Sequence, residues 1–129
     1  MELPGRSLVE DADELVRVLR HAGARFAFVH GSRVDGTATA DSDVDVAAWF
    51  AGTNPAPWDV VLPGGIDLLV LDRAPLELAG RVALHGALLF DDEPSARVEW
   101  QGDTRLEYLD EADFQRELAE VFFRSRRGR

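Results

Sequence analysis

Two aspartates near the middle of the chain, Asp43 and Asp45, have the clearest chemical potential of any residues in the sequence. Apolar residues lie between the two aspartates and after them, so Val44 to Phe50 is expected to form a strand. On a strand, Asp43 and Asp45 lie on one face, about 6–7 Å apart along the backbone. Carboxylates at this spacing can bind one or two hard divalent cations such as Mg²⁺. The pattern therefore predicts a metal site.

A Gly-Ser turn at Gly31 and Ser32 precedes this pair, with ten residues (33–42) in between. Residues 26–30 are expected to form a strand that leads into the turn, with His30 as a packed or capping residue at its end. Glycine lets the backbone approach a phosphate closely, and the turn offers N–H groups and a hydroxyl to bind it. Arg33 either contacts a triphosphate or is a solvated surface arginine. A phosphate cradle beside metal-binding carboxylates favours phosphoryl or nucleotidyl transfer.

This spacing resembles the signature of the polymerase-β-like nucleotidyltransferases, in which Gly-Ser, ten residues and Asp-x-Asp follow one another. Within that superfamily, the small size is similar to that of the minimal nucleotidyltransferases (MNT), several of which are antitoxins paired with HEPN-domain toxins. The likeness covers about residues 26–90 and, more loosely, the helical tail. It implies a third acidic residue on a neighbouring strand. Asp67, within the apolar run 66–71, fits that place, and Asp72 is the next candidate.

The resemblance implies a Mg²⁺-dependent enzyme that transfers AMP from ATP to a tyrosine hydroxyl of a HEPN toxin. This chain would then be the antitoxin. In the two-metal scheme of that superfamily, Asp43 and Asp45 would hold the cations that bridge the nucleoside triphosphate. Asp67 would ligate the metal nearest the acceptor and help to deprotonate its hydroxyl. Gly31 and Ser32 would bind the β- and γ-phosphates.

A structural explanation competes with the metal site, because residues 41–43 could simply cap a turn. Three features favour the metal site. Apolar strands flank both halves of the motif, the ten-residue gap matches, and Asp67 interrupts a run of Ile, Leu and Val. An aspartate inside a buried strand is costly unless it is paired or metal-bound.

Length, charge and hydropathy limit the number of domains, the class of partner and the location that are expected. The chain has 129 residues, so a single domain over 1–129 is expected. A net charge of −10 disfavours direct nucleic-acid binding, which depends on a basic surface, and suits a basic protein or a cationic small molecule. No apolar run approaches the roughly 18 residues that span a bilayer, and no secretory signal is visible. The expected location is cytoplasmic, without a membrane anchor.

Hydrophobic periodicity predicts an α/β fold: a small mixed sheet with packed helices and a helical C-terminal tail. By resemblance, this is the polymerase-β-like nucleotidyltransferase fold. Helices are expected from Ser7 to near Gly23, over a short segment 32–36, from Pro75 to Gly86, and from Pro94 to about Arg126, with Gly102 as a candidate bend. Strands are expected at 26–30, 44–50, 66–71 and 88–90, with a short edge strand within 58–62.

Two other functions stay open at this point. An antibiotic nucleotidyltransferase acting on an aminoglycoside or lincosamide hydroxyl would suit the acidic surface. Such enzymes usually carry a further substrate-binding region, however, and 129 residues leave little room for one. A non-catalytic antitoxin that only masks its toxin is the other alternative, and it would need no working metal site.

Overall fold

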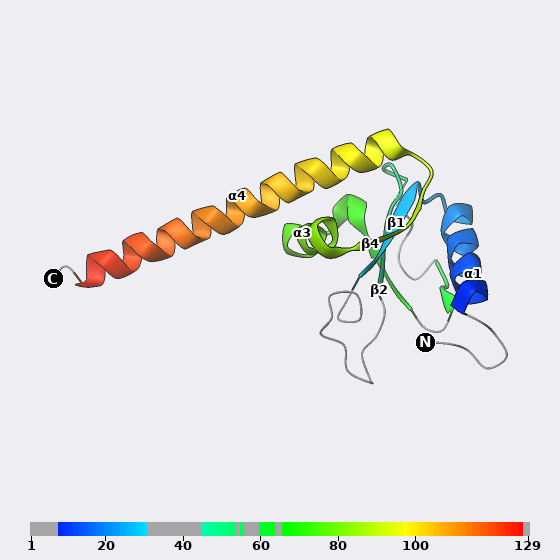
Figure 1. Cartoon of the computed structure of the whole chain (residues 1–129), viewed down its shortest axis with the longest axis horizontal. Helices are drawn as coiled ribbons and strands as arrows, with labels where there is room; N and C mark the ends of the chain where they lie inside the picture. Colours follow the sequence, from blue (N-terminus) through cyan, green and yellow to red (C-terminus); the bar gives the residue numbers. More distant parts are fainter. Residues whose placement is uncertain (1–7, 31–44, 54, 56–59, 64–65, 128–129) are drawn as a thin grey trace.

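A computed structural model of the chain describes residues 8–30, 45–53, 55, 60–63 and 66–127. In chain order, its elements are α1 (Leu8–His21), β1 (Phe26–His30), β2 (Asp45–Trp49), β3 (Asp67–Val70), the 3₁₀ turn η3 (Leu71–Arg73), α3 (Leu76–His85), β4 (Ala87–Asp91) and α4 (Pro94–Arg127). Figure 1 shows the strands between α1 on one side and α3 and α4 on the other. The expected α/β fold with a helical C-terminal tail is confirmed.

The four strands form one sheet in the order β3-β2-β1-β4. β1 lies in the middle and pairs antiparallel with both β2 and β4, whereas β2 and β3 pair in parallel. The sheet is therefore mixed, as expected. Because β2 and β3 run in the same direction and β1 runs against them, the first residues of β2 and β3 and the last residue of β1 share one edge.

Two apolar clusters cover the two faces of the sheet. The cluster on the α1 side includes Leu15 and Leu19 from that helix and Val46 from β2. The cluster on the other side includes Ala47 from β2 and Val82 from α3, with Trp100 from α4 packed against it. The alternation of side chains along β2 explains why Val46 and Ala47 belong to different clusters.

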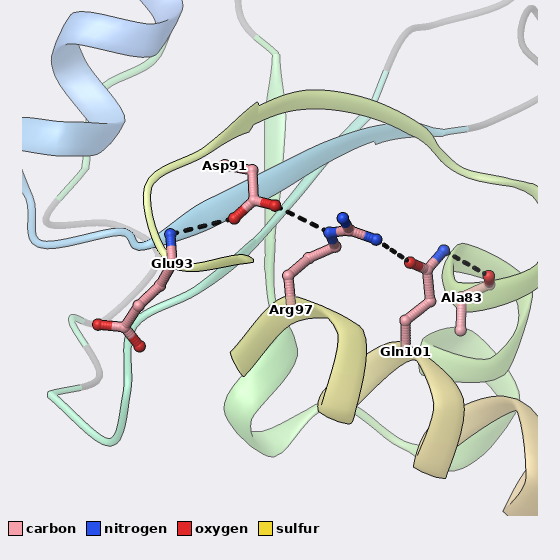
Figure 2. A network of polar contacts seen from close by, with 5 residues as sticks. All are labelled: Ala83, Asp91, Glu93, Arg97 and Gln101. Carbon is pink, nitrogen blue, oxygen red and sulfur yellow. Dashed lines mark hydrogen bonds and ion pairs between the residues drawn. The ribbon is translucent and has the colours of Figure 1, made fainter. Parts of the chain in front are cut away.

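A short polar network fixes the start of α4 against β4 and α3 (Figure 2). Arg97 donates through Nε to Asp91 Oδ2 at 2.9 Å and through Nη1 to Gln101 Oε1 at 3.1 Å. Gln101 Nε2 in turn donates to the Ala83 carbonyl of α3 at 3.1 Å. Asp91 Oδ1 also accepts the Glu93 backbone N–H at 3.1 Å. The network connects three elements through partly buried groups, so it determines the direction in which α4 leaves the sheet.

The middle of α3 lies close to α4 because Gly80 has no side chain. A Cβ placed on Gly80 would lie 2.2 Å from Tyr108 Cδ1 and 2.7 Å from Tyr108 Cβ. Both distances are far below a normal carbon–carbon contact. Gly80 is buried, so the backbone of α3 itself packs against the Tyr108 ring. This position therefore requires glycine.

The expected helix boundaries are largely confirmed. α3 has Pro75 as its N-cap and Gly86 as its C-cap, and α1 ends at His21, shortly before Gly23 with φ +102°. Gly102 produces no break, since α4 is one helix of 34 residues. The edge strand expected within 58–62 is wrong for the described residues 60–62, which form no strand. The helix expected over 32–36 lies outside the described residues.

Candidate active site

Three polar residues form one row across the edge of the sheet. His30 ends β1, Asp45 begins β2 and Asp67 begins β3. In the strand register, His30 is opposite Asp45, and Asp45 is opposite Asp67. Opposed residues on paired strands project from the same face, and adjacent strands lie about 4.8 Å apart. The three side chains are therefore neighbours, and we call them the polar row.

The polar row lies on the face of the sheet that α3 and α4 cover. Two residues further into each strand, the same face carries Phe28, Ala47 and Leu69, which belong to the apolar cluster beneath α3 and α4. Alternation along the strands gives the polar row the same orientation as these residues. The row thus borders an apolar surface on one side and the end of the sheet on the other.

The two aspartates of the row differ in exposure. Asp45 is half-buried, whereas Asp67, the first residue of β3, is exposed. The reasoning that treated Asp67 as an aspartate inside a buried strand is therefore wrong, because a carboxylate at an exposed strand end pays little desolvation. What places Asp67 beside Asp45 is the parallel register of β2 and β3.

His30 is packed, as the sequence indicated, and it also belongs to the polar row. Burial lowers the pKa of the imidazole, and the nearby Asp45 carboxylate opposes this effect only in part. Its Nε2 atom is buried and has no hydrogen-bond partner within the described part of the chain. Sequence reasoning did not include His30 in the site. Its place directly before the Gly-Ser turn was the signal that could have done so.

Four of the expected site residues lie in the segment 31–44, outside the described residues: Gly31, Ser32, Arg33 and Asp43. The chain leaves the sheet after His30 and returns at Asp45, so both ends of this segment are anchored at the polar row. Asp43 comes only two residues before Asp45 along the chain. The structure thus brings together Asp45, Asp67 and the points where the motif segment begins and ends.

Asp72, the alternative third carboxylate, has a structural task. Its Oδ1 accepts the Phe50 N–H and its Oδ2 accepts the Gly52 N–H, each at 2.8 Å. These bonds hold the turn after β2, where Ala51 has φ +56° and Gly52 has φ +84°. Both carboxylate oxygens already have donors, so Asp72 is poorly suited to bind a metal.

The donor chemistry of the polar row suits a hard cation. Asp45 and Asp67 offer carboxylate oxygens from adjacent strands, and these are the ligands that Mg²⁺ prefers. Among the described residues, no group of three or more His, Cys, Asp or Glu side chains is arranged to hold a metal. Two carboxylates thus come from the described strands, and Asp43 would have to supply a third.

Comparison with known proteins places this geometry in a known fold. No protein-family model and no curated protein matches the chain. Among solved structures, a chain of a toxin–antitoxin crystal structure with AMP-PNP matches at TM-score 0.69 and 23% identity, over 86% of this chain and 98% of that one. The chain has the MNT nucleotidyltransferase fold.

Two further solved structures have the same MNT fold. One is the MntA–HepT toxin–antitoxin crystal structure, at TM-score 0.65 and 20% identity, over 87% of this chain and 97% of the other. The second is a rebuilt structure of a tri-AMPylated Shewanella oneidensis HEPN toxin in complex with MNT antitoxin, at TM-score 0.65 and 20% identity, over 87% of this chain and 96% of the other.

In the described part of our chain, no helix is long and apolar enough to cross a membrane.

Proposed function

We propose that this chain is a Mg²⁺-dependent nucleotidyltransferase of the cytoplasm and the antitoxin of a HEPN/MNT pair. It transfers AMP from ATP to a tyrosine hydroxyl of its HEPN toxin, with residues 1–129 acting as a single domain. The observation that carries this proposal is the opposition of Asp45 and Asp67 at the sheet edge where the Gly-Ser segment begins and ends.

The proposed roles follow from these positions. Asp45 and Asp67, with Asp43, hold Mg²⁺, which supplies positive charge to offset the nucleotide triphosphate and to activate the acceptor oxygen. Gly31, Ser32 and Arg33 bind the β- and γ-phosphates. The tyrosine oxygen forms a bond to the α-phosphorus, the bond to the β-phosphate breaks, and pyrophosphate leaves. Asp67 faces the acceptor side and helps to take up the hydroxyl proton.

The solved structures of the same fold support this choice of substrate and partner. One contains AMP-PNP, an ATP analogue, and another contains an AMPylated HEPN toxin in complex with MNT antitoxin. At 20–23% identity, these likenesses concern other proteins, so donor and acceptor are proposals for this chain. The net charge of −10 suits a basic protein surface as docking partner.

Intact-mass measurement of the partner tests the proposal directly. The purified chain is incubated with its HEPN toxin, ATP and Mg²⁺, and the toxin is weighed before and after. We expect the toxin to gain the mass of one or more AMP groups, with peptide mapping to a tyrosine, and to gain none when EDTA is added.

Two results would contradict this function. An unmodified toxin that is still neutralised by the Asp45→Asn variant would indicate an antitoxin that acts only by masking. Modification of an aminoglycoside or lincosamide, with the toxin left unchanged, would indicate a resistance enzyme.

A further inference from the structure

The last helix is longer than the body that supports it. With 34 residues, α4 extends over about 51 Å at 1.5 Å per residue. Figure 1 shows its C-terminal part running well past α3. Tyr108 is the side chain that packs against Gly80 of α3, and from 109 to 125 every residue except the half-buried Ala112 is exposed. We call residues 109–127 the projecting segment.

The projecting segment carries an apolar seam. Phe114, Leu118 and Val121 are separated by four and three residues, and their exposed fractions are 53%, 48% and 59%. The same rhythm of four and three residues leads back through two exposed glutamates, Glu111 and Glu107, to the part of α4 that packs on the domain. The exposed apolar seam therefore begins at Phe114, beyond the part of α4 that packs on the domain. A lone helix of this length is marginal in water, so this face needs a cover.

The two halves of the projecting segment have net charges of opposite sign. Residues 109–117 carry four acidic residues (Asp110, Glu111, Asp113 and Glu117) and one basic residue, Arg116. Residues 119–127 carry three arginines, at 124, 126 and 127, and one acidic residue, Glu120. Such an arrangement is complementary to itself when two copies lie antiparallel, because each basic end then meets an acidic half. A parallel pair would instead place like charges side by side.

We propose that the projecting segments of two copies pair antiparallel and cross at Leu118. Leu118 is the midpoint of residues 109–127, so residue 127 of the second copy would reach residue 109. The pairing would use the whole projecting segment and stop where the helix meets its own domain. It would bring Phe114 next to Val121 of the second copy, and Arg116 next to Glu120 of the second copy. Length, apolar seam and charge therefore agree on a second copy as the occupant.

Sedimentation velocity of the purified full chain tests this pairing over roughly a hundredfold range of concentration. We expect a dimer that dissociates on dilution. Leu118→Glu should raise its dissociation constant at least about tenfold, because two glutamates would meet at the crossing. At a concentration low enough for the wild-type chain to be monomeric, circular dichroism and the melting temperature of the variant should match those of the wild-type chain, since Leu118 is exposed in the monomer. As a matched control, Leu106→Glu changes a more exposed leucine off the seam, 63% exposed, and should leave the dimer intact.

A charge exchange tests the antiparallel direction. Reversing the three arginines at 124, 126 and 127 to glutamate should weaken the dimer. Reversing Asp110, Glu111 and Asp113 to arginine in the same chain should restore it, and added salt should reduce both effects.

The proposal is overturned if the chain stays monomeric at every concentration, or if Leu118→Glu leaves the dimer unchanged. If the chain is monomeric and Leu118→Glu also abolishes binding of the HEPN toxin, the seam binds that partner and the pairing is refuted. The pairing does not depend on nucleotidyl transfer. A monomeric chain that modifies its toxin would refute only the pairing, and a dimer without transfer would refute only the proposed function.

Discussion

Asp45 and Asp67 are opposed across two parallel strands, and each is the first residue of its strand. Adjacent parallel strands hold such a pair at a nearly fixed separation, about 4.8 Å between backbones. The two carboxylates are therefore positioned by sheet hydrogen bonding. A cation bound between them would require little rearrangement of these two ligands, and the following predictions depend on this pair.

Replacing Asp45 with asparagine should weaken Mg²⁺ binding and reduce AMP transfer at least about a hundredfold, because a neutral amide cannot offset the charge of the cation. Stability without metal should be kept or slightly raised, since the change removes repulsion from Asp67. Calorimetric titration with Mg²⁺ and a transfer assay measure the two effects. Asp13→Asn is a suitable control, because it removes an exposed carboxylate from α1, on the other face of the sheet. Transfer at the wild-type rate would refute the assignment of Asp45.

Replacing Asp67 with asparagine should affect nucleotide affinity and the rate of transfer to different degrees. If its role is to activate the acceptor, Asp67→Asn lowers the rate of transfer far more than it lowers nucleotide affinity. Single-turnover rates and equilibrium binding of a non-hydrolysable ATP analogue provide the comparison. An equal loss in both would point instead to a general metal-binding role for this exposed carboxylate.

Asp72→Ala should affect stability and leave the chemistry of the site intact. The change removes the acceptor for the N–H groups of Phe50 and Gly52 and leaves the partly buried Phe50 N–H without a partner. We expect the free energy of unfolding to fall by about 1–3 kcal/mol, measured by urea denaturation. Asp72→Asn keeps one acceptor oxygen, so its free energy of unfolding should lie between those of the wild-type chain and Asp72→Ala. A folded Asp72→Ala variant that binds no Mg²⁺ would show that Asp72 is a ligand after all.

A pair of glycine variants tests the packing of α3 on α4. Gly80→Ala places a methyl group into the Tyr108 side chain and should cost about 1–3 kcal/mol of unfolding free energy. Gly102→Ala meets no atom within 4 Å, so it should instead stabilise α4 by about 0.5–1 kcal/mol. Thermal or urea unfolding of both variants gives the comparison. Equal effects at the two positions would contradict the close approach at Gly80.

The stability of the metal-free chain should decrease in mild acid because of His30. Burial lowers the pKa of the folded imidazole, with Asp45 opposing the shift, so the unfolded chain binds the proton more readily. Unfolding free energy is therefore fully retained above the ordinary histidine pKa of about 6.5 and declines as pH falls below it, until the folded imidazole also protonates. Urea denaturation of the chain and of His30→Gln at about pH 8 and pH 5.5 measures the difference. The prediction is wrong if the wild-type chain loses no more unfolding free energy between these two pH values than His30→Gln does.

Local patterns in the sequence were enough for most elements of the fold. Pro75 and Gly86 bracket α3 as expected, and the apolar runs at 26–30 and 66–71 contain β1 and β3. These features depend on residues that are neighbours along the chain, where proline and glycine conformations and the periodicity of side chains act directly. The prediction of an edge strand near 60–62 was wrong, because strand propensity in an apolar run does not by itself provide a neighbouring strand to pair with.

The arrangement of the carboxylates was decided by the tertiary structure. Asp45 and Asp67 are 22 residues apart in the chain (67 − 45), and only the parallel register of β2 and β3 makes them neighbours. Asp72 is equally acidic, but the turn after β2 occupies both of its oxygens. Sequence patterns identified which residues could bind a cation. Register and hydrogen bonding between distant segments determined which of them meet, because these depend on the packing of the whole sheet.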